Sequence, residues 1–454
     1  MKIKNICCIG AGFVGGPTMA VIASQCPKIK ITVVDKNKDK ISRWNENNLN
    51  NLPVFEPGLK QIISEVRNVN LFFSNDIEQS IVESEMIFLA VNTPTKEKGE
   101  GAGMAADLKH IISCAKTIAR VSKSNKIVVE KSTLPVRTAE KLKEILEKNK
   151  RASVRFDVIS NPEFLAEGTA IRDLFKSDRV LIGGDQSKSG KKAVKSLVDI
   201  YSAWIPKRKI LTVNVWSSEL SKLVSNAMLA QRISSINSIS ALSKKTEADI
   251  DEISIAVGMD KRIGEKFLKV SPGFGGSCFK KDVLNLVYLC KHYGLDEVAE
   301  YWYSIIKIND YQRKRIVNIV DQYVKENKEE KRITILGWSF KKDTNDSRES
   351  SSIYIANEFL KKDYNISVFD PRVGIGRIRQ DLKFLNRTIT DSNSEIKIKS
   401  VETITSLSEV ENNSRLVIVL TEWDEFKRIN KEKNDLKIFD FRNYLDPNKI
   451  IYRF

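Results

Sequence analysis

The sequence predicts an α/β protein with two Rossmann-like, doubly wound parallel-sheet domains that are joined by a linker of long helices. Three observations predict this class. Short runs of β-branched residues alternate with amphipathic stretches in the first part of the chain and again after Arg332. Two long helical patterns occupy the middle of the chain. A glycine-rich turn directly follows the first β-branched run.

The first sheet is predicted from apolar, β-branched runs at residues 3–9, 29–34, 86–91, 126–130, 156–159 and 179–182. Since strands that alternate with helices form parallel sheets covered on both faces, we expect these runs to be buried. The middle of the chain has a proline-free helical pattern at residues 216–245 and a second one at 282–325, interrupted at Gly294. We expect these helices to connect two sheet domains.

The second sheet is predicted because the chain repeats its opening pattern. Residues 333–337 resemble residues 6–10, residues 366–370 resemble 31–35, and later strands are expected at 416–420 and 437–439. The repeat indicates a second nucleotide-binding half. We therefore predict a first sheet domain at 1–213, a central helical linker at 214–325 and a second sheet domain at 326–454.

The chain has 454 residues and a formal charge of +17. Such a charge suits nucleic acid, an acidic membrane or anionic small substrates. Lysine is spread along the whole chain, however, and no basic block with interleaved aromatic residues is present. We therefore expect an anionic small-molecule substrate and no nucleic-acid partner.

The six cysteines and two histidines restrict location and chemistry. No cysteines form a C-x-x-C pair and no spacing suits zinc, which predicts reduced thiols, a cytoplasmic protein and no metal site. We expect neither a membrane span nor a signal peptide, because no run of about eighteen apolar residues occurs and the first strand begins near Ile3. His110 and His292 lie in helix-like stretches, so acid–base chemistry is expected of Lys, Asp, Glu and water.

The glycine-rich turn, Gly10-Ala11-Gly12-Phe13-Val14-Gly15, follows a predicted strand and opens a predicted helix. In that context the first glycine permits the tight turn, the second admits a pyrophosphate and the third lets the helix pack on the strand. Asp35, at the end of the second strand, is spaced to accept a ribose hydroxyl and would repel a 2′-phosphate. This combination predicts NAD as the cofactor.

Two loops follow predicted strands at residues 91–95 and 131–135. Ligands of open α/β sheets bind at the carboxyl ends of strands, so their hydroxyls could contact a ligand or water. Ordinary turn chemistry is an equal alternative. Residues 160–168 place Glu163 and Glu167 four apart, which suits either acidic residues near a helix start or a base with a cofactor-side acid.

Lys222 and Asn226 share one face of the first long helix and could together stabilise an oxyanion. Spacing alone favours the alternative, a surface pair of Glu219 with Lys222.

Cys278 ends the glycine-rich loop 272–278, which lets the backbone approach a ligand closely. A helix is expected to begin near Cys278, and its N-terminus together with two lysines would favour a thiolate. Asp282 lies one turn further on and could manage the proton of that thiol. A structural cysteine is the equal alternative.

The second domain is not expected to bind a dinucleotide in the same manner. Its glycine, Gly337, is followed by Trp338, Ser339 and Phe340, whose side chains would block a close approach of pyrophosphate to the backbone.

Together these motifs resemble the UDP-glucose 6-dehydrogenase family, within the wider UDP-sugar and GDP-mannose dehydrogenases. The eukaryotic branch is resembled most, through residues 230–238. The resemblance covers nearly the whole chain and rests on residues 10–15, 91–95, 131–133, 161–168, 219–226, 273–282 and 337–350. It implies oxidation of UDP-glucose to UDP-glucuronate in two NAD-dependent steps through a thiohemiacetal and a thioester.

The resemblance also implies roles for individual residues. Cys278 would be the nucleophile, Lys222 and Asn226 would stabilise the oxygen, and Asp282 would act on water and proton transfer. Glu163 would assist thioester hydrolysis and Thr133 would position water. NAD would contact Gly10, Gly12, Phe13, Val14, Gly15, Asp35, Lys40, Val91, Thr93, Ser132, Glu167 and Arg348.

The UDP-sugar would contact a third set of residues, and Arg262 would reach the site of a neighbouring subunit. That set comprises Glu163, Phe164, Leu165, Lys222, Asn226, Lys269, Phe274, Gly275, Phe340, Lys341 and Arg442. The family implies a homo-oligomer that is dimer-based and up to a hexamer, with the central helices as the dimerisation domain.

The chain departs from the family at Lys40, where a close relative would carry Arg, and at Asn443, which replaces a second basic residue after Arg442. The extended C-terminal tail of some members is expected to be absent. Two other functions stay open: the same chemistry on GDP-mannose or an N-acetylated UDP-sugar, and a basic nucleotide- or RNA-binding protein without catalysis.

Overall fold

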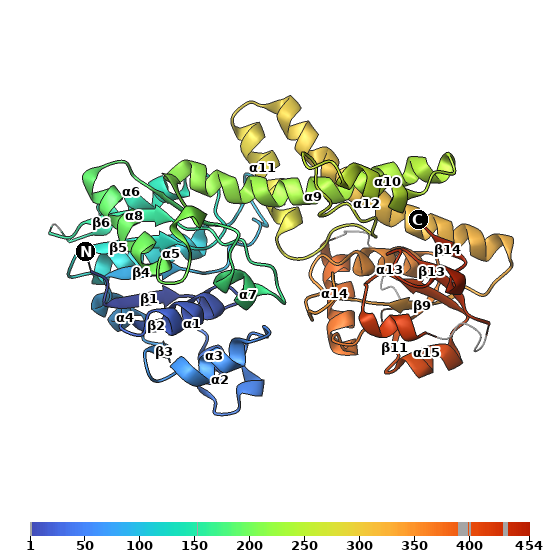
Figure 1. Cartoon of the computed structure of the whole chain (residues 1–454), viewed down its shortest axis with the longest axis horizontal. Helices are drawn as coiled ribbons and strands as arrows, with labels where there is room; N and C mark the ends of the chain where they lie inside the picture. The colour runs from blue at the N-terminus through green and yellow to red at the C-terminus, as the bar shows by residue number, and fades with distance from the viewer. Residues whose placement is uncertain (1, 152, 389–397, 399–400, 430–434) are drawn as a thin grey trace. The chain divides into compact units, whose positions relative to one another are not determined.

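The computed structural model describes residues 2–151, 153–388, 398, 401–429 and 435–454 of the chain. Internal contacts divide the chain into two compact units, unit 1 up to Ser225 and unit 2 from Asn226. The predicted class of two parallel-sheet domains, with a helical region between their sheets in the sequence, is confirmed (Figure 1). The predicted boundaries of three domains stay a prediction.

Unit 1 is built on an eight-stranded sheet with the order β3-β2-β1-β4-β5-β6-β7-β8 (Figure 1). The strands are β1 (Asn5–Ile9), β2 (Lys30–Val34), β3 (Leu71–Ser74), β4 (Met86–Leu89), β5 (Lys126–Glu130), β6 (Phe156–Ser160), β7 (Val180–Gly184) and β8 (Ile210–Asn214). Every neighbouring pair is parallel except β6 and β7, which corrects the prediction of a purely parallel sheet. β7, and β8 parallel to it, run opposite to the other strands. Only the short helix α7 and its flanking loops connect β6 to β7, and such a connection permits an antiparallel return.

Helices cover both faces of this sheet, as the buried strands require. They are α1 (Gly15–Gln25), α2 (Lys38–Asn45), α3 (Leu59–Val66), α4 (Ile77–Glu83), α5 (Lys109–Val121), α6 (Thr138–Asn149), α7 (Ala170–Phe175) and α8 (Lys188–Tyr201), with 3-10 turns η1 (Leu49–Asn51) and η2 (Lys207–Lys209). Side chains of α1, α3 and α8 share one core with alternate strand residues, and those of α5 and α6 share the other. Cys7 and Cys8 point into opposite cores, so β1 is buried on both faces.

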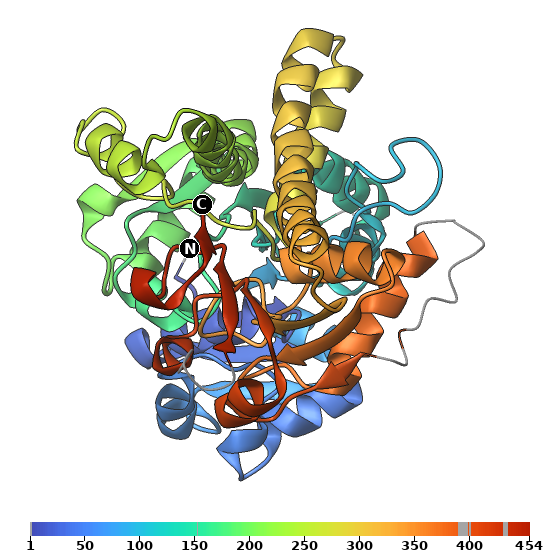
Figure 2. The same ribbon diagram turned by 90° about the vertical axis from the view of Figure 1, so that its right-hand side faces the viewer.

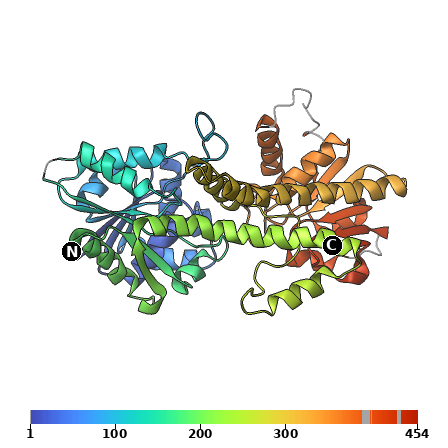
Figure 3. The same ribbon diagram turned by 90° about the horizontal axis from the view of Figure 1, so that it is seen from above.

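The long helix α9 (Val215–Lys245) begins in unit 1 and continues into unit 2. Unit 2 adds α10 (Ile250–Gly258), α11 (Phe279–His292) and α12 (Asp296–Glu326). α11 and α12 form a hairpin around Gly294 (Figure 2). The part of α9 in unit 2 lies beside α12, where the Ser234 hydroxyl donates to the carbonyl of Ile305 at 2.9 Å (Figure 3).

The sheet of unit 2 has six parallel strands in the order β11-β10-β9-β12-β13-β14, the same winding as the first six strands of unit 1. They are β9 (Arg332–Leu336), β10 (Asn365–Phe369), β11 (Glu402–Thr403), β12 (Leu416–Val419), β13 (Lys437–Asp440) and β14 (Tyr452–Arg453). Covering elements are α13 (Ser351–Lys361), α14 (Ile375–Thr388), α15 (Leu407–Asn413), η4 (Asp424–Arg428) and η6 (Pro447–Lys449). No described helix of either unit has the length and apolarity to span a bilayer.

Candidate active site

The glycine turn of unit 1 connects β1 to α1 and has the shape that a pyrophosphate requires. Gly10 has a φ of +115°, and a Cβ there would lie 2.3 Å from the carbonyl oxygen of Ala90. At Gly15 a Cβ would lie 1.9 Å from the carbonyl oxygen of Gly10. At Gly12, by contrast, a Cβ would meet no atom within 4 Å. The backbone is therefore tightly packed at Gly10 and Gly15, whereas the space beside Gly12 is open. A phosphate can approach the start of α1 at Gly12.

Asp35 follows β2 and lies against the same turn. Its carboxylate accepts hydrogen bonds from the backbone N–H of Ala11 at 3.1 Å, from that of Asn37 at 3.0 Å and from the Lys40 ammonium at 2.8 Å. Burial by itself raises the pKa of Asp35, but these donors outweigh it and the pKa lies below its ordinary value. The group is thus an ionised acceptor suited to a ribose hydroxyl. The residues present fit an NAD molecule.

The loops after β4 and β5 are tied together at the carboxyl edge of the sheet. The Ser132 hydroxyl donates to the carbonyl of Val91 at 2.6 Å, and the Thr93 hydroxyl donates to the carbonyl of Thr133 at 3.0 Å. These two hydroxyls therefore fix the loops, and the loops bring four predicted site residues together. Whether they also contact a ligand stays a prediction.

A buried ion pair joins Glu163, in the loop after β6, to Lys222 on α9. The carboxylate and the ammonium lie 3.1 Å apart, and both side chains are more than nine-tenths buried. The Leu165 N–H also donates to Glu163, at 2.6 Å. The Phe164 ring lies 5.4 Å below the Lys222 ammonium and 3.8 Å from the Arg179 guanidinium. Glu163, Phe164, Leu165 and Lys222 thus gather as expected.

The alternative that paired Glu219 with Lys222 on the surface is wrong. Glu219 is 3% exposed and accepts hydrogen bonds from the N–H groups of Arg137 and Ala139, at 2.8 Å each. These N–H groups lie at the N-terminus of α6, whose unpaired donors attract a carboxylate. Lys222 is one turn further along α9, where it meets Glu163 instead.

A second buried lysine near this pair was not singled out from the sequence. Lys131 directly follows β5, and its ammonium donates to Asn161 Oδ1 at 3.1 Å and to the Tyr201 hydroxyl at 3.3 Å. Tyr201 in turn donates to Asn161 Oδ1 at 2.8 Å. Burial lowers the pKa of Lys131 to about 8. A lysine that ends an otherwise apolar run was the available signal, but Tyr201 is 70 residues away and no local pattern connects the two.

In unit 2, Cys278 is the residue directly before α11 and is half-buried. Its Sγ lies 3.6 Å from the Ser277 hydroxyl. Asp282 lies one turn on, with its N–H bonded to the carbonyl of Cys278 at 2.9 Å. The Asp282 side chain is 1% exposed and accepts a hydrogen bond from Asn226 Nδ2 at 2.6 Å. Three of the predicted catalytic residues are thereby brought together at the start of one helix.

The loop before Cys278 requires glycine. Gly273 has a φ of +117° and Gly276 of +81°, conformations that other residues rarely adopt. A Cβ at Gly275 would lie 2.9 Å from Cβ of Phe340. Two residues predicted to contact the substrate, Gly275 and Phe340, are therefore in van der Waals contact, and Phe274 lies next to them in the loop.

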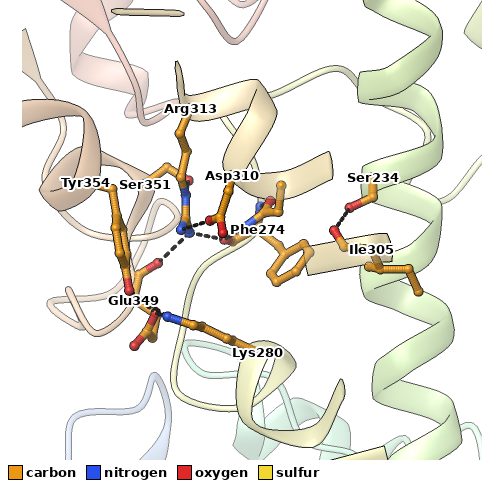
Figure 4. A network of polar contacts seen from close by, with 10 residues as sticks. Ser234, Phe274, Lys280, Ile305, Asp310, Arg313, Glu349, Ser351 and Tyr354 are labelled. Carbon is orange, nitrogen blue, oxygen red and sulfur yellow. Dashed lines mark hydrogen bonds and ion pairs between the residues drawn. The ribbon is translucent and has the colours of Figure 1, made fainter. Parts of the chain in front are cut away.

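Arg313 of α12 holds this loop in place (Figure 4). Its guanidinium donates to the carbonyl of Phe274 at 2.9 Å, to the carbonyl of Glu349 at 3.3 Å and to the Ser351 hydroxyl at 3.1 Å. It also lies 4.1 Å from the ring centre of Tyr354. Arg313 thus connects the cysteine loop to the segment that follows Phe340.

Lys280 and Glu349 close the same network (Figure 4). The Lys280 ammonium lies 2.9 Å from Glu349 Oε2 and 2.9 Å from the Tyr354 hydroxyl, and Tyr354 also donates to Glu349. Lys280, one of the two lysines expected to favour a thiolate at Cys278, thus has Glu349 as its ion-pair partner.

The second glycine turn, at Gly337, repeats the backbone contacts of the first turn but differs from it in side-chain contacts. Gly337 N–H bonds the carbonyl of Phe369 at 2.8 Å, as Gly10 N–H bonds that of Val34. Asp370 corresponds to Asp35, but its carboxylate accepts from the N–H groups of Trp338 and Ser339 and from the Trp423 indole. Trp338 is fully buried. Asp370 differs from Asp35 in its side-chain partners, because Asp370 accepts from an indole whereas Asp35 accepts from the Lys40 ammonium. That this turn excludes a dinucleotide stays a prediction.

The other predicted contacts are spread over unit 2. Arg442 forms an ion pair with Glu422, Arg348 with Asp346 at 2.6 Å and Arg262 with Asp260 at 2.6 Å. Lys341 lies 5.6 Å from the ring centre of Phe340, and Lys269 is exposed. In unit 1, Phe13 is exposed, Val14 and Glu167 are half-buried, and Lys40 is paired with Asp35. Their ligand contacts stay predictions.

A parallel sheet with this glycine turn and Asp35 defines a dinucleotide-dependent oxidoreductase, and the thiol of unit 2 adds a candidate nucleophile. Three domain models of one family match the chain in order. They are the NAD binding domain of the UDP-glucose/GDP-mannose dehydrogenase family at residues 4–205, its central domain at 216–311 and its UDP binding domain at 334–447. The chain belongs to this family, and the prediction of NAD as its cofactor is confirmed.

Known proteins resemble the chain over nearly its whole length. UDP-glucose 6-dehydrogenase 1 of Glycine max is 50% identical over 98% of this chain and 94% of its own. UDP-glucose 6-dehydrogenase of Mus musculus is 50% identical over 98% of this chain and 90% of its own. The solved structure of a UDP-glucose dehydrogenase from Pyrobaculum islandicum superposes with a TM-score of 0.83 at 26% identity, covering 99% and 97% of the two chains.

Proposed function

We propose that the protein oxidises UDP-glucose at C6 to UDP-glucuronate with two molecules of NAD. The observation that carries the proposal is Cys278 at the start of α11, with the buried Asp282–Asn226 pair one turn away. The match to an NAD binding domain and a UDP binding domain supports both ligands. The identity of about 50% to enzymes named UDP-glucose 6-dehydrogenase supports glucose as the sugar.

The proposed reaction needs no oxidant other than NAD. When bound, NAD accepts one hydride from the C6 alcohol and a second molecule accepts one from the later thiohemiacetal. The alcohol loses a hydride and a proton to become an aldehyde, and the Cys278 thiolate adds to that carbon. Loss of the second hydride leaves a thioester. Water then displaces the thiolate, so that UDP-glucose, two NAD⁺ and water give UDP-glucuronate, two NADH and three protons.

The side chains of the chain divide this work in our proposal. The Lys222 ammonium and the Asn226 amide stabilise the oxygen that becomes negative when the thiolate adds. Asp282 handles the proton of the attacking group, and it can do so because it lies one turn from Cys278. Glu163, kept ionised by Lys222, acts as base for thioester hydrolysis, and Thr133 positions the water.

We further propose the ligand contacts that the family implies. NAD lies along the glycine turn and Asp35, and Phe274, Gly275, Phe340, Lys341, Lys269 and Arg442 contact the UDP-sugar. The free thiols support a cytoplasmic protein. Exposed apolar side chains on the unit 2 helices, including Leu242 and Ile255, support a dimer-based homo-oligomer, up to a hexamer, in which Arg262 reaches a neighbouring site.

The test is a spectrophotometric assay with NAD and a panel of sugar nucleotides. We expect two equivalents of NADH for each UDP-glucose and little with GDP-mannose or N-acetylated UDP-sugars. One equivalent, with release of an aldehyde, would contradict the thioester route. If only another sugar nucleotide gave NADH, that sugar nucleotide would replace UDP-glucose as the proposed substrate. Nucleic-acid binding that falls steeply with salt, without NADH from any sugar, would favour a binding protein.

A further inference from the structure

Unit 1 contains a buried positive charge that the proposed mechanism does not use. Lys131 is 4% exposed at the carboxyl end of β5, and its ammonium bonds the neutral side chains of Asn161 and Tyr201. Burying an ammonium without a directly bonded carboxylate is costly, and an apolar side chain of similar length would usually be better tolerated. Stability therefore does not explain this lysine.

The partners of Lys131 come from three elements and fix its position. Asn161 follows β6, and its Nδ2 donates to the carbonyl of Leu181 on β7 at 2.8 Å. Tyr201 ends α8 and donates to Asn161. The ammonium is thus held by a network that is itself fully buried, so its charge has a defined place at the edge of the sheet.

Glu163 is two residues beyond Asn161, the residue that binds the Lys131 ammonium. The charged groups that act electrostatically on Lys131 are Glu163, from the loop after β6, and Lys222, from α9. The Cys8 thiol faces it from β1, but burial raises the pKa of Cys8 to about 12, so this thiol is neutral near pH 7. Burial likewise raises the pKa of Tyr201. Two ammonium groups, those of Lys131 and Lys222, therefore act on the Glu163 carboxylate.

We propose that Lys131 is a positioning residue whose positive charge keeps Glu163 in its ionised form. Asn161, which binds the Lys131 ammonium and precedes Glu163 by two residues, holds that charge in place. The inference rests on the role as base proposed for Glu163. Two cations acting on one carboxylate make it a weaker base but ensure that it is unprotonated when water must be activated. Burial favours the protonated acid, and the second ammonium adds to the effect of Lys222 against it.

The test is the pH profile of kcat for NADH formation from UDP-glucose, in the wild type and in Lys131→Met. We expect the acid limb of the profile to move to higher pH by roughly half a unit or more, because Glu163 loses one of its cations. A residue that only supports packing would lower kcat without moving this limb. An acid limb at the wild-type position would overturn the proposal.

The matched control is Lys126→Met at the other end of the same strand. Lys126 is also buried, and its ammonium donates to the carbonyls of Val82 and Ser84 at 2.9 and 2.6 Å. Lys126→Met removes the same charge at the end of β5 that is distant from the Glu163–Lys222 ion pair. The acid limb of its pH profile should therefore match that of the wild type. If Lys131→Met does not fold, Asn161→Asp places a carboxylate 3.1 Å from the same ammonium and should shift the limb in the same direction.

A second readout separates this inference from the proposed function. Infrared titration of the cofactor-free protein follows the Glu163 carboxylate band, assigned by its loss in Glu163→Gln. We expect the band to disappear at higher pH in Lys131→Met than in the wild type. An unchanged titration refutes the inference even if UDP-glucose is oxidised, and absence of NADH from UDP-glucose refutes the proposed function even if the band shifts.

Discussion

At the scale of residues, the proposed chemistry depends on a cysteine that a helix N-terminus and a glycine loop place together. Cys278 precedes α11, where the unpaired N–H groups of the first turn favour a thiolate. The loop before it bends at Gly273 and Gly276, both with positive φ. Such requirements are local, which explains why the loop and its cysteine stand out in the sequence.

Replacing Cys278 by Ser should retain NAD binding and either slow the second oxidation or trap a covalent ester. A serine oxygen is a weaker nucleophile, and the oxygen ester that it can form is hydrolysed more slowly than a thioester. We expect NAD affinity within about twofold of the wild type and a drop in turnover of at least about 10²-fold. Intact-mass spectrometry should detect a covalent sugar nucleotide. The control is Cys290→Ala, which lies in the same helix but away from its start. Normal turnover of Cys278→Ser would exclude the Cys278 thiol from the mechanism.

Replacing Asp35 by Ala should weaken NAD more than UDP-glucose. The carboxylate is the group at the glycine turn that can accept a ribose hydroxyl, and it also holds Lys40. Loss of one charged hydrogen bond corresponds to about 2 kcal/mol, or roughly thirtyfold in the Kd of NAD. Fluorescence titration measures both ligands, and discrimination against NADP should fall as well. If Asp35→Ala bound NAD with the wild-type affinity, Asp35 would not be the residue that binds the ribose.

Residue contacts between distant segments were the part that the sequence could not predict. Glu219 and Lys222 are three apart on α9, and spacing favours a pair, yet tertiary structure gives each a different partner. Lys131 meets Tyr201 because β5 and α8 end at the same edge of the sheet. Helical spacing limits which side chains can meet within one element, and only the packing of elements decides which do.

At the scale of elements, a buried pair of carboxyl groups joins β5 to α9. Glu130 ends β5 and is 1% exposed, and no N–H or O–H donor of the described residues bonds its oxygens apart from the Glu219 carboxyl. Two carboxyl groups can bond each other only if they share a proton. Glu219 also anchors the start of α6 through Ala139. We expect such a shared proton to stabilise the junction of β5, α6 and α9.

This pair makes stability fall as the pH rises. Burial raises the pKa of both Glu130 and Glu219. The folded chain therefore binds more protons than the unfolded chain, and the stability that these protons contribute is lost as the two groups ionise at higher pH. Glu130→Gln supplies a permanent donor to Glu219 and should be about 1–2 kcal/mol more stable than the wild type near pH 8, with no gain near pH 5. Urea unfolding at the two pH values measures this. A gain that is equal at both would show that no shared proton is present.

Most elements were predictable because their patterns are local. β1 and β5 each contain a short apolar run, and α9 lies within one residue of the helix expected at 216–245. The reversal of β7 was not predictable, since an apolar run has no signal for strand direction. The repeat of the two sheets was visible in the sequence, but the different use of Asp35 and Asp370 depends on Trp423, which comes from a distant segment.

At the scale of the whole molecule, the proposed assembly into an oligomer rests on exposed apolar side chains of unit 2. Leu242 on α9 is 61% exposed, Ile255 on α10 is 64% exposed and Met259 just after α10 is 79% exposed. Large exposed apolar side chains mark a contact with another protein chain where they form a contiguous patch. Arg262, three residues beyond Met259, extends its side chain into solvent with Asp260 as its partner. A homo-oligomer would cover the apolar residues and give Arg262 a ligand.

If Arg262 acts in the site of a neighbouring subunit, two inactive variants should complement each other. Arg262→Ala lacks the cross-subunit contact, and Cys278→Ser lacks the thiol. In a mixed dimer one site combines the intact Cys278 of the first chain with the intact Arg262 of the second. Random pairing makes half of the dimers mixed, so about one quarter of all sites should work. Co-expression with two different tags, purification and the NADH assay measure this fraction. Arg262→Lys mixed with Arg262→Ala is the control without complementation, and a mixture no more active than its parents would place Arg262 within its own subunit's site or outside any site.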